Sequence, residues 1–230
     1  MDSAFISEEL LRLGIHEYGF FETAKLSADY AGELPYGISI VVPLSDAVVD
    51  AIHTAPTYAY FQHYRAINAL IDQAVLHLGL CLAARGARYF PVAASQSIPD
   101  AGAFCGLLSH KAAARLSGLG TVGKNALFLS YRYGARVRLG TLLTDWPLPV
   151  HASDEVRDVC GACTRCVQAC PAMALRGQVW QPGRDRSEIV DAAACSQYMK
   201  RQFQHIGRGA VCGICMRACP YRGEERKRHR

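Results

Sequence analysis

The stretch CGACTRCVQACP, residues 160–171, decides how the second half of this sequence folds. Its first three cysteines, Cys160, Cys163 and Cys166, are three residues apart. The fourth, Cys170, follows after a gap of four and directly precedes a proline. Eight of the ten cysteines of the chain lie within residues 151–230, so this half is unusually rich in thiols.

A second stretch, CGICMRACP at residues 212–220, repeats most of this pattern. When the first stretch is shifted by 49 residues, it predicts cysteines at positions 209, 212, 215 and 219, and all but the first of these hold one. Gly209 occupies the remaining position. The missing thiol must therefore come from elsewhere in this half, where Cys195 is the one cysteine outside the two stretches.

The spacing C-x2-C-x2-C-x3-C-P is typical of bacterial ferredoxins that hold two iron–sulfur clusters. Three cysteines on one tight loop can each reach a different iron of one cubane, whereas the fourth is carried away and ligates the other cluster. The sequence therefore predicts two [4Fe–4S] clusters with crossed ligands. Cluster I takes Cys160, Cys163, Cys166 and Cys219. Cluster II takes Cys170, Cys195, Cys212 and Cys215.

Two alternatives would also use eight cysteines. Four-cysteine zinc sites need the same number of thiolates, but zinc ligands usually come as C-x2-C pairs that a longer spacer separates. Disulfides are disfavoured in a reducing cytosol. We expect a cytoplasmic protein because the N-terminal MDSAFISEELLRLG carries acids and no basic segment followed by an apolar one. Apolar runs such as Gly37–Leu44 are too short to cross a bilayer, so no membrane partner is expected.

The composition is that of an ordinary globular protein, because 50% of the 230 residues are hydrophobic and 20% are charged. A polar run with two prolines, near Thr144–Glu155, marks a candidate boundary. We expect a domain at residues 1–150, a ferredoxin-like domain at 151–221 and a basic tail at 222–230.

Local patterns in residues 1–150 indicate helices and strands that do not alternate strictly, which favours an α+β layer. Apolar residues at helical spacing predict a helix over residues 58–85 that ends at Gly86. The other expected elements are a short amphipathic helix at 7–20, a strand at 36–44, a strand at 87–94, a helix at 108–118 and a hairpin at 125–145 that turns around Tyr133–Gly134.

The formal net charge is +5, and the segment Tyr221–Arg230 is strongly basic. This segment has two interpretations. It is either a solvated chain end, or a contact surface for nucleic acid or an acidic protein. Two clusters of about −2 each would bring the net charge of the loaded protein to about +1. The overall charge therefore says little about binding partners.

The segment GLGTVGKN, Gly118–Asn125, matches the dinucleotide-binding pattern G-x-G-x-x-G. It also nearly matches the P-loop, except that Asn125 stands where Ser or Thr should hold Mg²⁺. Both motifs need a strand before the glycines and a helix after them. Here the expected order is reversed, which favours a tight helix-to-strand turn over nucleotide binding.

Taken in order, the segments GLGTVGKNALFL, GTLLTDWPLP, CGACTRCVQACP, CSQYMK and CGICMRACP resemble the epoxyqueuosine reductase family, which is related in layout to reductive dehalogenases. The resemblance covers roughly residues 35–221. These are cobalamin- and iron–sulfur-dependent enzymes. The resemblance implies a nitroreductase-like α+β domain that holds cobalamin or another corrinoid, followed by a ferredoxin-like module with two [4Fe–4S] clusters. Supply of one ligand by Cys195 is also the arrangement of this family.

The same resemblance implies a function and a binding loop. The clusters would pass low-potential electrons, supplied by an external donor such as ferredoxin or flavodoxin, to a corrinoid that reduces a substrate. The substrate is a small or tRNA-borne molecule that the sequence does not name. The residues that would contact the corrinoid are Ser97, Gly118, Gly120, Gly123, Lys124 and Asn125. At the glycines, the missing side chains would allow close approach.

Two departures from the family concern catalysis. The family carries an aspartate, its expected proton donor, in a D-S-A-P stretch, whereas this sequence reads QSIP from Gln96 to Pro99. An amide cannot act as a general acid. Asp100, His110 and Lys111 are alternative donors, and His110 is also a candidate structural residue at a helix start.

The second departure is length. Full-length enzymes of the family continue into a helical-repeat domain that grips tRNA, whereas this chain stops after Arg230. An electron-transfer or corrinoid-handling protein without substrate turnover of its own is therefore the alternative to a reductase.

Overall fold

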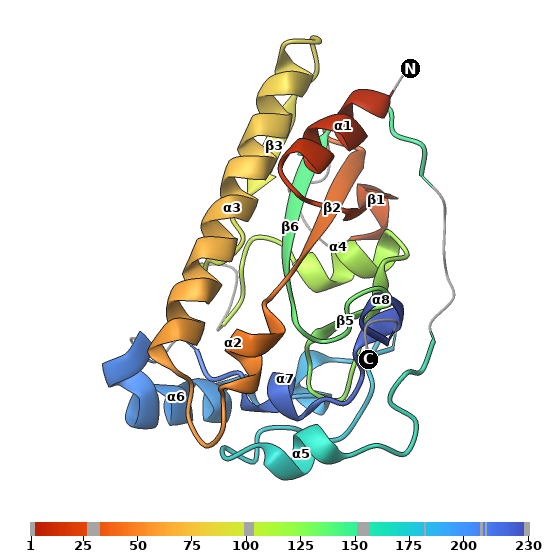
Figure 1. The fold of residues 1–230 in the computed structure, drawn as a ribbon. Helices are drawn as coiled ribbons and strands as arrows, with labels where there is room; N and C mark the ends of the chain where they lie inside the picture. The colour runs from red at the N-terminus through yellow and green to blue at the C-terminus, as the bar shows by residue number, and fades with distance from the viewer. Residues whose placement is uncertain are drawn as a thin grey trace. The chain divides into compact units, whose positions relative to one another are not determined.

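The computed structural model describes residues 3–26, 33–98, 104–150, 157–181, 183–207, 209 and 211–227 (Figure 1). Its contacts divide the chain into two compact units. Unit 1 comprises Met1–Val42, Ile67–Leu119 and Arg138–Glu155. Unit 2 comprises Pro43–Ala66, Gly120–Val137 and Val156–Arg230. Each unit gathers three separate segments of the chain. The domain boundaries expected from the cysteine distribution stay a prediction.

Unit 1 is built on a four-stranded sheet with the order β1-β2-β6-β3. Its strands are β1 (Glu17–Glu22), β2 (Tyr36–Pro43), β6 (Val137–Thr144) and β3 (Tyr89–Val92). β1 pairs antiparallel with β2, and β3 pairs antiparallel with β6. The inner residues of β2 are buried throughout, as expected for the β-branched run ISIVV. Pro91 lies in the edge strand β3, where a residue without a backbone donor is tolerated.

Helices cover this sheet and complete the apolar core of unit 1 (Figure 1). α1 (Ala4–Arg12) and the part of α3 (Tyr58–Ala83) that begins at Ile67 contribute to the main cluster, and α4 (His110–Leu116) contributes Ala113 to a second one. The short η1 (Thr23–Lys25) follows β1. Ile71 and Leu78 of α3 pack with Ile40 of β2 in one buried cluster. α3 is closed by Gly86, whose φ is +84°, and by the N–H of Ala87, which donates to the carbonyl of Leu82 at 3.1 Å.

Unit 2 is made mainly of short elements. These are α2 (Asp46–Asp50), β4 (Gly120–Val122), β5 (Phe128–Ser130), α5 (Arg165–Ala169), η4 (Arg186–Glu188), α6 (Ala192–Gly207), α7 (Ile214–Ala218) and α8 (Gly223–Lys227). β4 and β5 form a separate two-stranded antiparallel sheet. Helices α5 and α7 contact each other. Because such short helices are marginal on their own, this unit depends on what they pack around.

The structure confirms the α+β class and most of the expected elements. The strand at 36–44 corresponds to β2, and the helix at 58–85 corresponds to α3. The strand at 87–94 and the helix at 108–118 contain β3 and α4. In α4, Ser109 caps the N-terminus by accepting the N–H of Ala112.

Two expected elements were wrong. The helix at 7–20 ends at Arg12, and the residues after it form β1, because Gly14 turns the chain with a φ of +73°. The hairpin at 125–145 does not form as a pair of adjacent strands. The chain does reverse between Ser130 and Gly134, but β5 pairs with β4 and β6 joins the sheet of unit 1.

α3 also corrects the expectation that apolar runs are too short to cross a bilayer. Within the described residues it is the one helix long and apolar enough to do so, with 26 residues and a mean hydropathy of 1.5. Length and composition are weak evidence, because a core helix of a soluble protein passes the same test. One face of α3 contributes Ile71, Val75 and Leu82 to the core of unit 1.

Candidate metal centres

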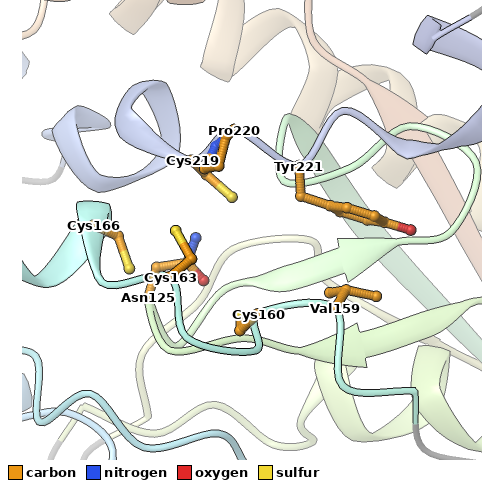
Figure 2. Close-up of a pocket in the computed structure, with 8 residues that line it drawn as sticks. All are labelled: Asn125, Val159, Cys160, Cys163, Cys166, Cys219, Pro220 and Tyr221. Atoms are coloured by element: carbon orange, nitrogen blue, oxygen red, sulfur yellow. The ribbon is translucent and has the colours of Figure 1, made fainter.

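A pocket in unit 2 gathers cysteines from both repeated stretches (Figure 2). It contains about 330 Å³ of atom-free space, part of which is open to solvent. Its lining residues are Asn125, Val159, Cys160, Cys163, Cys166, Cys219, Pro220 and Tyr221. The four cysteines are the predicted ligands of cluster I, and Cys219 comes from the other stretch. The structure thus brings this set together, while its ligand role stays a prediction.

The loop that carries Cys160 and Cys163 is held by side chains on both sides. One carboxylate oxygen of Asp158 accepts the N–H groups of Cys160 at 2.9 Å and Gly161 at 3.1 Å. The N–H of Cys163 donates to the carbonyl of Cys160 at 2.9 Å. From the β4–β5 turn, the Nζ of Lys124 donates to the carbonyl of Gly161 at 2.7 Å. Gly161 has a φ of +45°, so a glycine suits this tight turn.

The second set of cysteines, Cys170, Cys195, Cys212 and Cys215, also gathers in unit 2. Burial raises the pKa of the Cys215 thiol, and the thiols of Cys212, Cys195, Cys170 and Cys166 raise it further. The pKa of Cys195 is raised by burial and then by Cys170. Because these thiols act on one another, they are neighbours in space. Four of them, Cys170, Cys195, Cys212 and Cys215, are the predicted ligands of cluster II, and Cys166 belongs to the predicted ligands of cluster I.

The uneven spacing of the cysteines follows from two matching helices. Cys166 lies on α5 and Cys170 caps its C-terminus, four residues later. Cys215 lies on α7 and Cys219 caps its C-terminus in the same way. The residue before a proline favours an extended conformation, so Pro171 and Pro220 end both helices. Each short helix therefore presents one thiol to each set of cysteines.

The chemistry of these thiols fits an iron–sulfur cluster. Burial is the main cause that raises the pKa of both Cys212 and Cys219 to about 11. At neutral pH such thiols stay protonated unless a cation stabilises the thiolate, as the irons of a cluster would. All ten cysteines are free thiols. Zinc requires its ligands within about 2.3 Å of one centre. In the described part of the chain, no three His, Cys, Asp or Glu residues are placed to hold one metal ion.

Gly209, the position at which the cysteine repeat breaks, is sterically constrained. Its φ is +69°, and a Cβ added there would lie 2.6 Å from the Cα of Lys200 on α6. A cysteine side chain therefore cannot be placed without moving the helix. The same helix provides Cys195, which takes part in the second set instead.

The β4–β5 hairpin contains most of the loop that the resemblance assigns to a corrinoid. α4 precedes it, Gly118 leaves that helix with a φ of +72°, and a strand follows, which confirms the expected helix-to-strand order. A Cβ at Gly120 would lie 2.2 Å from the carbonyl oxygen of Leu129, and one at Gly123 would lie 2.5 Å from its Cδ1. The close approach that these glycines permit is thus to Leu129, within the hairpin.

Thr121, between those glycines, provides one observation in favour of a bound group. Its hydroxyl is buried and finds no hydrogen-bond partner among the described residues. A buried polar atom without a partner is costly, and a cofactor is one way to satisfy it. The contact of this loop with a corrinoid stays a prediction.

Lys124 and Asn125 occupy a place that the sequence did not predict. Lys124 is bonded to Gly161, and Asn125 is buried in the lining of the cysteine pocket (Figure 2). The side-chain oxygen of Asn125 accepts the N–H of Leu127 at 3.1 Å. Since Lys124 and Gly161 are 37 residues apart, no local pattern in the sequence could have revealed this contact.

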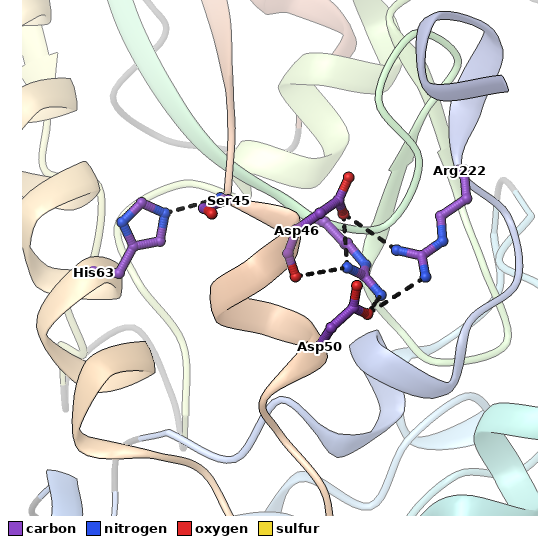
Figure 3. Close-up of polar contacts among 6 residues, drawn as sticks. Ser45, Asp46, Asp50, His63 and Arg222 are labelled. Atoms are coloured by element: carbon purple, nitrogen blue, oxygen red, sulfur yellow. Dashed lines mark hydrogen bonds and ion pairs between the residues drawn. The ribbon is translucent and has the colours of Figure 1, made fainter. Parts of the chain in front are cut away.

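A second unpredicted feature is an ion-pair network beside the segment that follows Cys219 (Figure 3). Arg136 is 1% exposed and donates to Asp46 at 2.6 Å and to Asp50 at 2.5 Å. Arg222 approaches the same carboxylates at 3.2 and 3.6 Å. The hydrogen bond from Arg136 is the main cause that lowers the pKa of Asp50. The network connects Arg222, in the segment after Cys219, with α2.

His63 and Ser45 form a further contact near α2 (Figure 3). The Nε2 of His63 accepts the backbone N–H of Ser45 at 3.0 Å, and burial lowers the pKa of the imidazole. Both observations favour a neutral histidine that holds the start of α2.

The candidate proton donors receive little support. Asp100 and Pro99 lie outside the described residues, Gln96 and Ser97 are exposed, and Lys111 is half-buried on α4. His110 is engaged at both ring nitrogens. Its Nδ1 contacts the hydroxyl of Thr141 at 2.7 Å, and its Nε2 lies 2.9 Å from the carbonyl of Ala93. Burial lowers the pKa of His110, so the geometry fits a neutral structural histidine.

Comparison with known proteins agrees with the cysteine pattern. A family model for a 4Fe-4S double cluster binding domain matches residues 159–222. Over 128 residues, the chain is 35% identical to an epoxyqueuosine reductase of Gloeobacter violaceus. That match covers 50% of this chain and 36% of the relative, so the chain spans about a third of the length of this curated protein.

Solved structures show the fold. An epoxyqueuosine reductase from Streptococcus thermophilus has a TM-score of 0.57 and 20% identity, over 98% of this chain and 67% of that one. A catabolic reductive dehalogenase has a TM-score of 0.74 and 17% identity, over 96% of this chain and 32% of that one. The motifs, the matched domain and the shared fold agree: the chain carries a 4Fe-4S double cluster binding domain, is similar over half of its length to epoxyqueuosine reductases, and shares its fold with solved epoxyqueuosine reductases and a reductive dehalogenase.

Proposed function

We propose that the protein is a cobalamin-dependent iron–sulfur reductase, which passes low-potential electrons through two [4Fe–4S] clusters to a corrinoid that reduces an unidentified substrate. The observation that carries this proposal is the crossed gathering of the cysteines. Cys219 lines the same pocket as Cys160, while the thiol of Cys170 raises the pKa of Cys195 and Cys215. Two neighbouring clusters that share two helices suit the stepwise delivery of single electrons.

The protein would hold and orient the corrinoid with Ser97 and the loop Gly118–Asn125. Cobalamin, when bound, would supply a strongly reducing cobalt centre. The unpartnered hydroxyl of Thr121 supports this assignment from the structure. A relative of the same fold also supports the binding of cobalamin, because the structure of one reductive dehalogenase suggests a mechanism for B12-dependent dehalogenation.

The partners and the compartment are part of the proposal. The electrons would come from a ferredoxin or flavodoxin in the cytoplasm, without a membrane partner. One solved epoxyqueuosine reductase contains an epoxyqueuosine-modified tRNA stem loop. A tRNA-borne substrate is therefore one candidate for this chain, beside a small molecule.

Anaerobic purification and reconstitution with iron, sulfide and cobalamin test this function. We expect about eight irons per chain and a corrinoid that stays with the protein through gel filtration. Full loading of the clusters with no retained corrinoid would refute the part of the proposal that concerns cobalamin. The absorbance spectrum of each fraction distinguishes the two results.

Two observations favour the alternative, an electron-transfer or corrinoid-handling protein without turnover. Gln96 stands where the family has its aspartate, and both ring nitrogens of His110 are engaged. A chemical reductant should then reduce bound corrinoid while candidate substrates, including epoxyqueuosine tRNA, stay unchanged. Product formation under these conditions would favour the reductase.

A further inference from the structure

Lys124 connects the β4–β5 turn with the cysteine loop of cluster I. Its ammonium group donates to the carbonyl of Gly161, which lies between Cys160 and Cys163. The resemblance assigns this lysine to the corrinoid, but the contact in the structure is to the loop that carries cluster ligands. Lys124 therefore has a role that can be tested with the iron–sulfur clusters alone.

The charges around Cys160 act in opposite directions. The carboxylate of Asp158 accepts the backbone N–H of Cys160, whereas the ammonium group of Lys124 donates to the carbonyl of Gly161 in the same loop. A carboxylate disfavours additional negative charge nearby, and an ammonium group favours it. The positive charge of Lys124 thus offsets the negative charge of Asp158 at this loop.

A reduced cluster carries one more negative charge than its oxidised form. Its reduction potential depends on the net charge around it, on hydrogen bonds to its sulfurs and on solvent exposure. An ammonium group held close to the cluster stabilises the reduced form more than the oxidised one. The potential of the cluster therefore rises when such a group is fixed in place.

We propose that Lys124 is a positioning residue for cluster I, which anchors the Cys160–Cys163 loop and raises the reduction potential of this cluster. The inference rests on the proposed ligand set of cluster I, and it requires no corrinoid. Its anchoring part comes from the hydrogen bond to Gly161. Its electrostatic part comes from the charge, so the two parts can be separated by substitution.

Three substitutions in the full chain, reconstituted anaerobically with iron and sulfide, separate these parts. Lys124→Arg keeps the charge and donors, Lys124→Gln keeps a donor without the charge, and Lys124→Met removes both. Lys200→Met removes a charge from the exposed face of α6, the helix that carries Cys195, and serves as the matched control. A Cys163→Ser variant first assigns the EPR signal of cluster I.

EPR-monitored redox titration gives the potential of each cluster. We expect Lys124→Gln to lower the potential of cluster I without moving that of cluster II, and Lys124→Arg to keep both near the parent values. Lys124→Met should show the same shift together with a lower iron content at cluster I. If Lys124→Met does not fold, by circular dichroism, the comparison of the other two variants decides.

An unchanged cluster I potential in Lys124→Gln would overturn the proposal. So would equal shifts at both clusters, or a shift of cluster I in Lys200→Met as large as that in Lys124→Gln. These results are independent of the proposed function, because failure to bind a corrinoid would refute the reductase and leave the potentials unaffected.

Discussion

The two sets contain four cysteines each, but different elements of the chain carry and support them. Cys160 and Cys163 lie on one short loop and Cys166 lies on the helix α5 that follows it, and Lys124 of the β4–β5 turn donates a hydrogen bond to that loop. In the other set, Cys195 comes from α6, Cys215 lies on α7, and Cys212 lies just before that helix. One set thus depends on a loop and a hairpin, whereas the other depends on the placement of a helix.

The largest expected effect comes from Cys170→Ala, which tests whether the sets cross. We expect loss of the cluster held by Cys195, Cys212 and Cys215, with about half of the iron lost, while the nearer cluster remains. Iron analysis and EPR measure both. Cys81→Ala, outside both sets, is the control and should keep all the iron. Selective loss of the cluster of Cys160 would contradict the assignment.

Gly120→Ala should disturb the hairpin that supports the first set. Its Cβ would lie 2.2 Å from a backbone carbonyl oxygen, so we expect destabilisation by about 1–3 kcal/mol. Cluster I should be lost on warming before cluster II, which temperature-dependent EPR would show. Gly14→Ala, which is strained by a φ of +73° but brings its Cβ into open space in unit 1, is the control for a general loss of stability.

Gly209→Ala is the corresponding test for the second set of cysteines. Its added Cβ would press on Lys200 of α6 at a positive φ, at a cost of about 1–2 kcal/mol for the backbone alone. We expect cluster II to become the more labile of the two clusters. If Gly120→Ala and Gly209→Ala affect the same cluster, the two sets do not have separate supports.

Arg136→Met should have a smaller effect. Removal of one partner from a buried ion pair costs about 3–5 kcal/mol, but the carboxylates of Asp46 and Asp50 are half-exposed, so we expect about 1–2 kcal/mol. Chemical denaturation of the reconstituted protein measures this. Asp50→Asn, which leaves Asp46 as a partner, should cost less. An equal or larger cost in Asp50→Asn would show that the network is not shared.

The smallest effect on stability is expected from Thr121→Val. The substitution removes a buried hydroxyl without a partner and keeps the shape of the side chain, so stability should change by less than about 1 kcal/mol. The informative measurement is cobalamin retention. If the hydroxyl serves the cofactor, retention falls while both clusters load normally, and unchanged retention would remove this support for the binding loop.

Local patterns in the sequence were sufficient for much of the fold. The β-branched run of β2 and the helical spacing of α3 specify those elements without help from the rest of the chain. β1 was missed because Gly14 breaks an apolar pattern that continues past it. β6 was misassigned because its partners, β2 and β3, lie far away in the sequence, and pairing over such distances leaves no local signal.

The candidate site also has a part that the sequence predicts and a part that it does not. The cysteines could be found because a cluster needs several thiols within one tight loop, which fixes their spacing. The contact of Lys124 with Gly161 and the ion pairs of Arg136 join segments that are remote in the sequence. Such contacts depend on the folded arrangement, so neither composition nor periodicity could predict them.

The paired helices α5 and α7 have a consequence for the speed of electron flow. Cys166 lies on α5 and Cys170 caps it four residues later, and Cys215 and Cys219 stand in the same relation on α7. If each helix holds one ligand of each cluster, the gap between the clusters is set by two short rigid spacers. Electron tunnelling slows steeply as such a gap widens, so its rate would be protected from motions elsewhere in the chain.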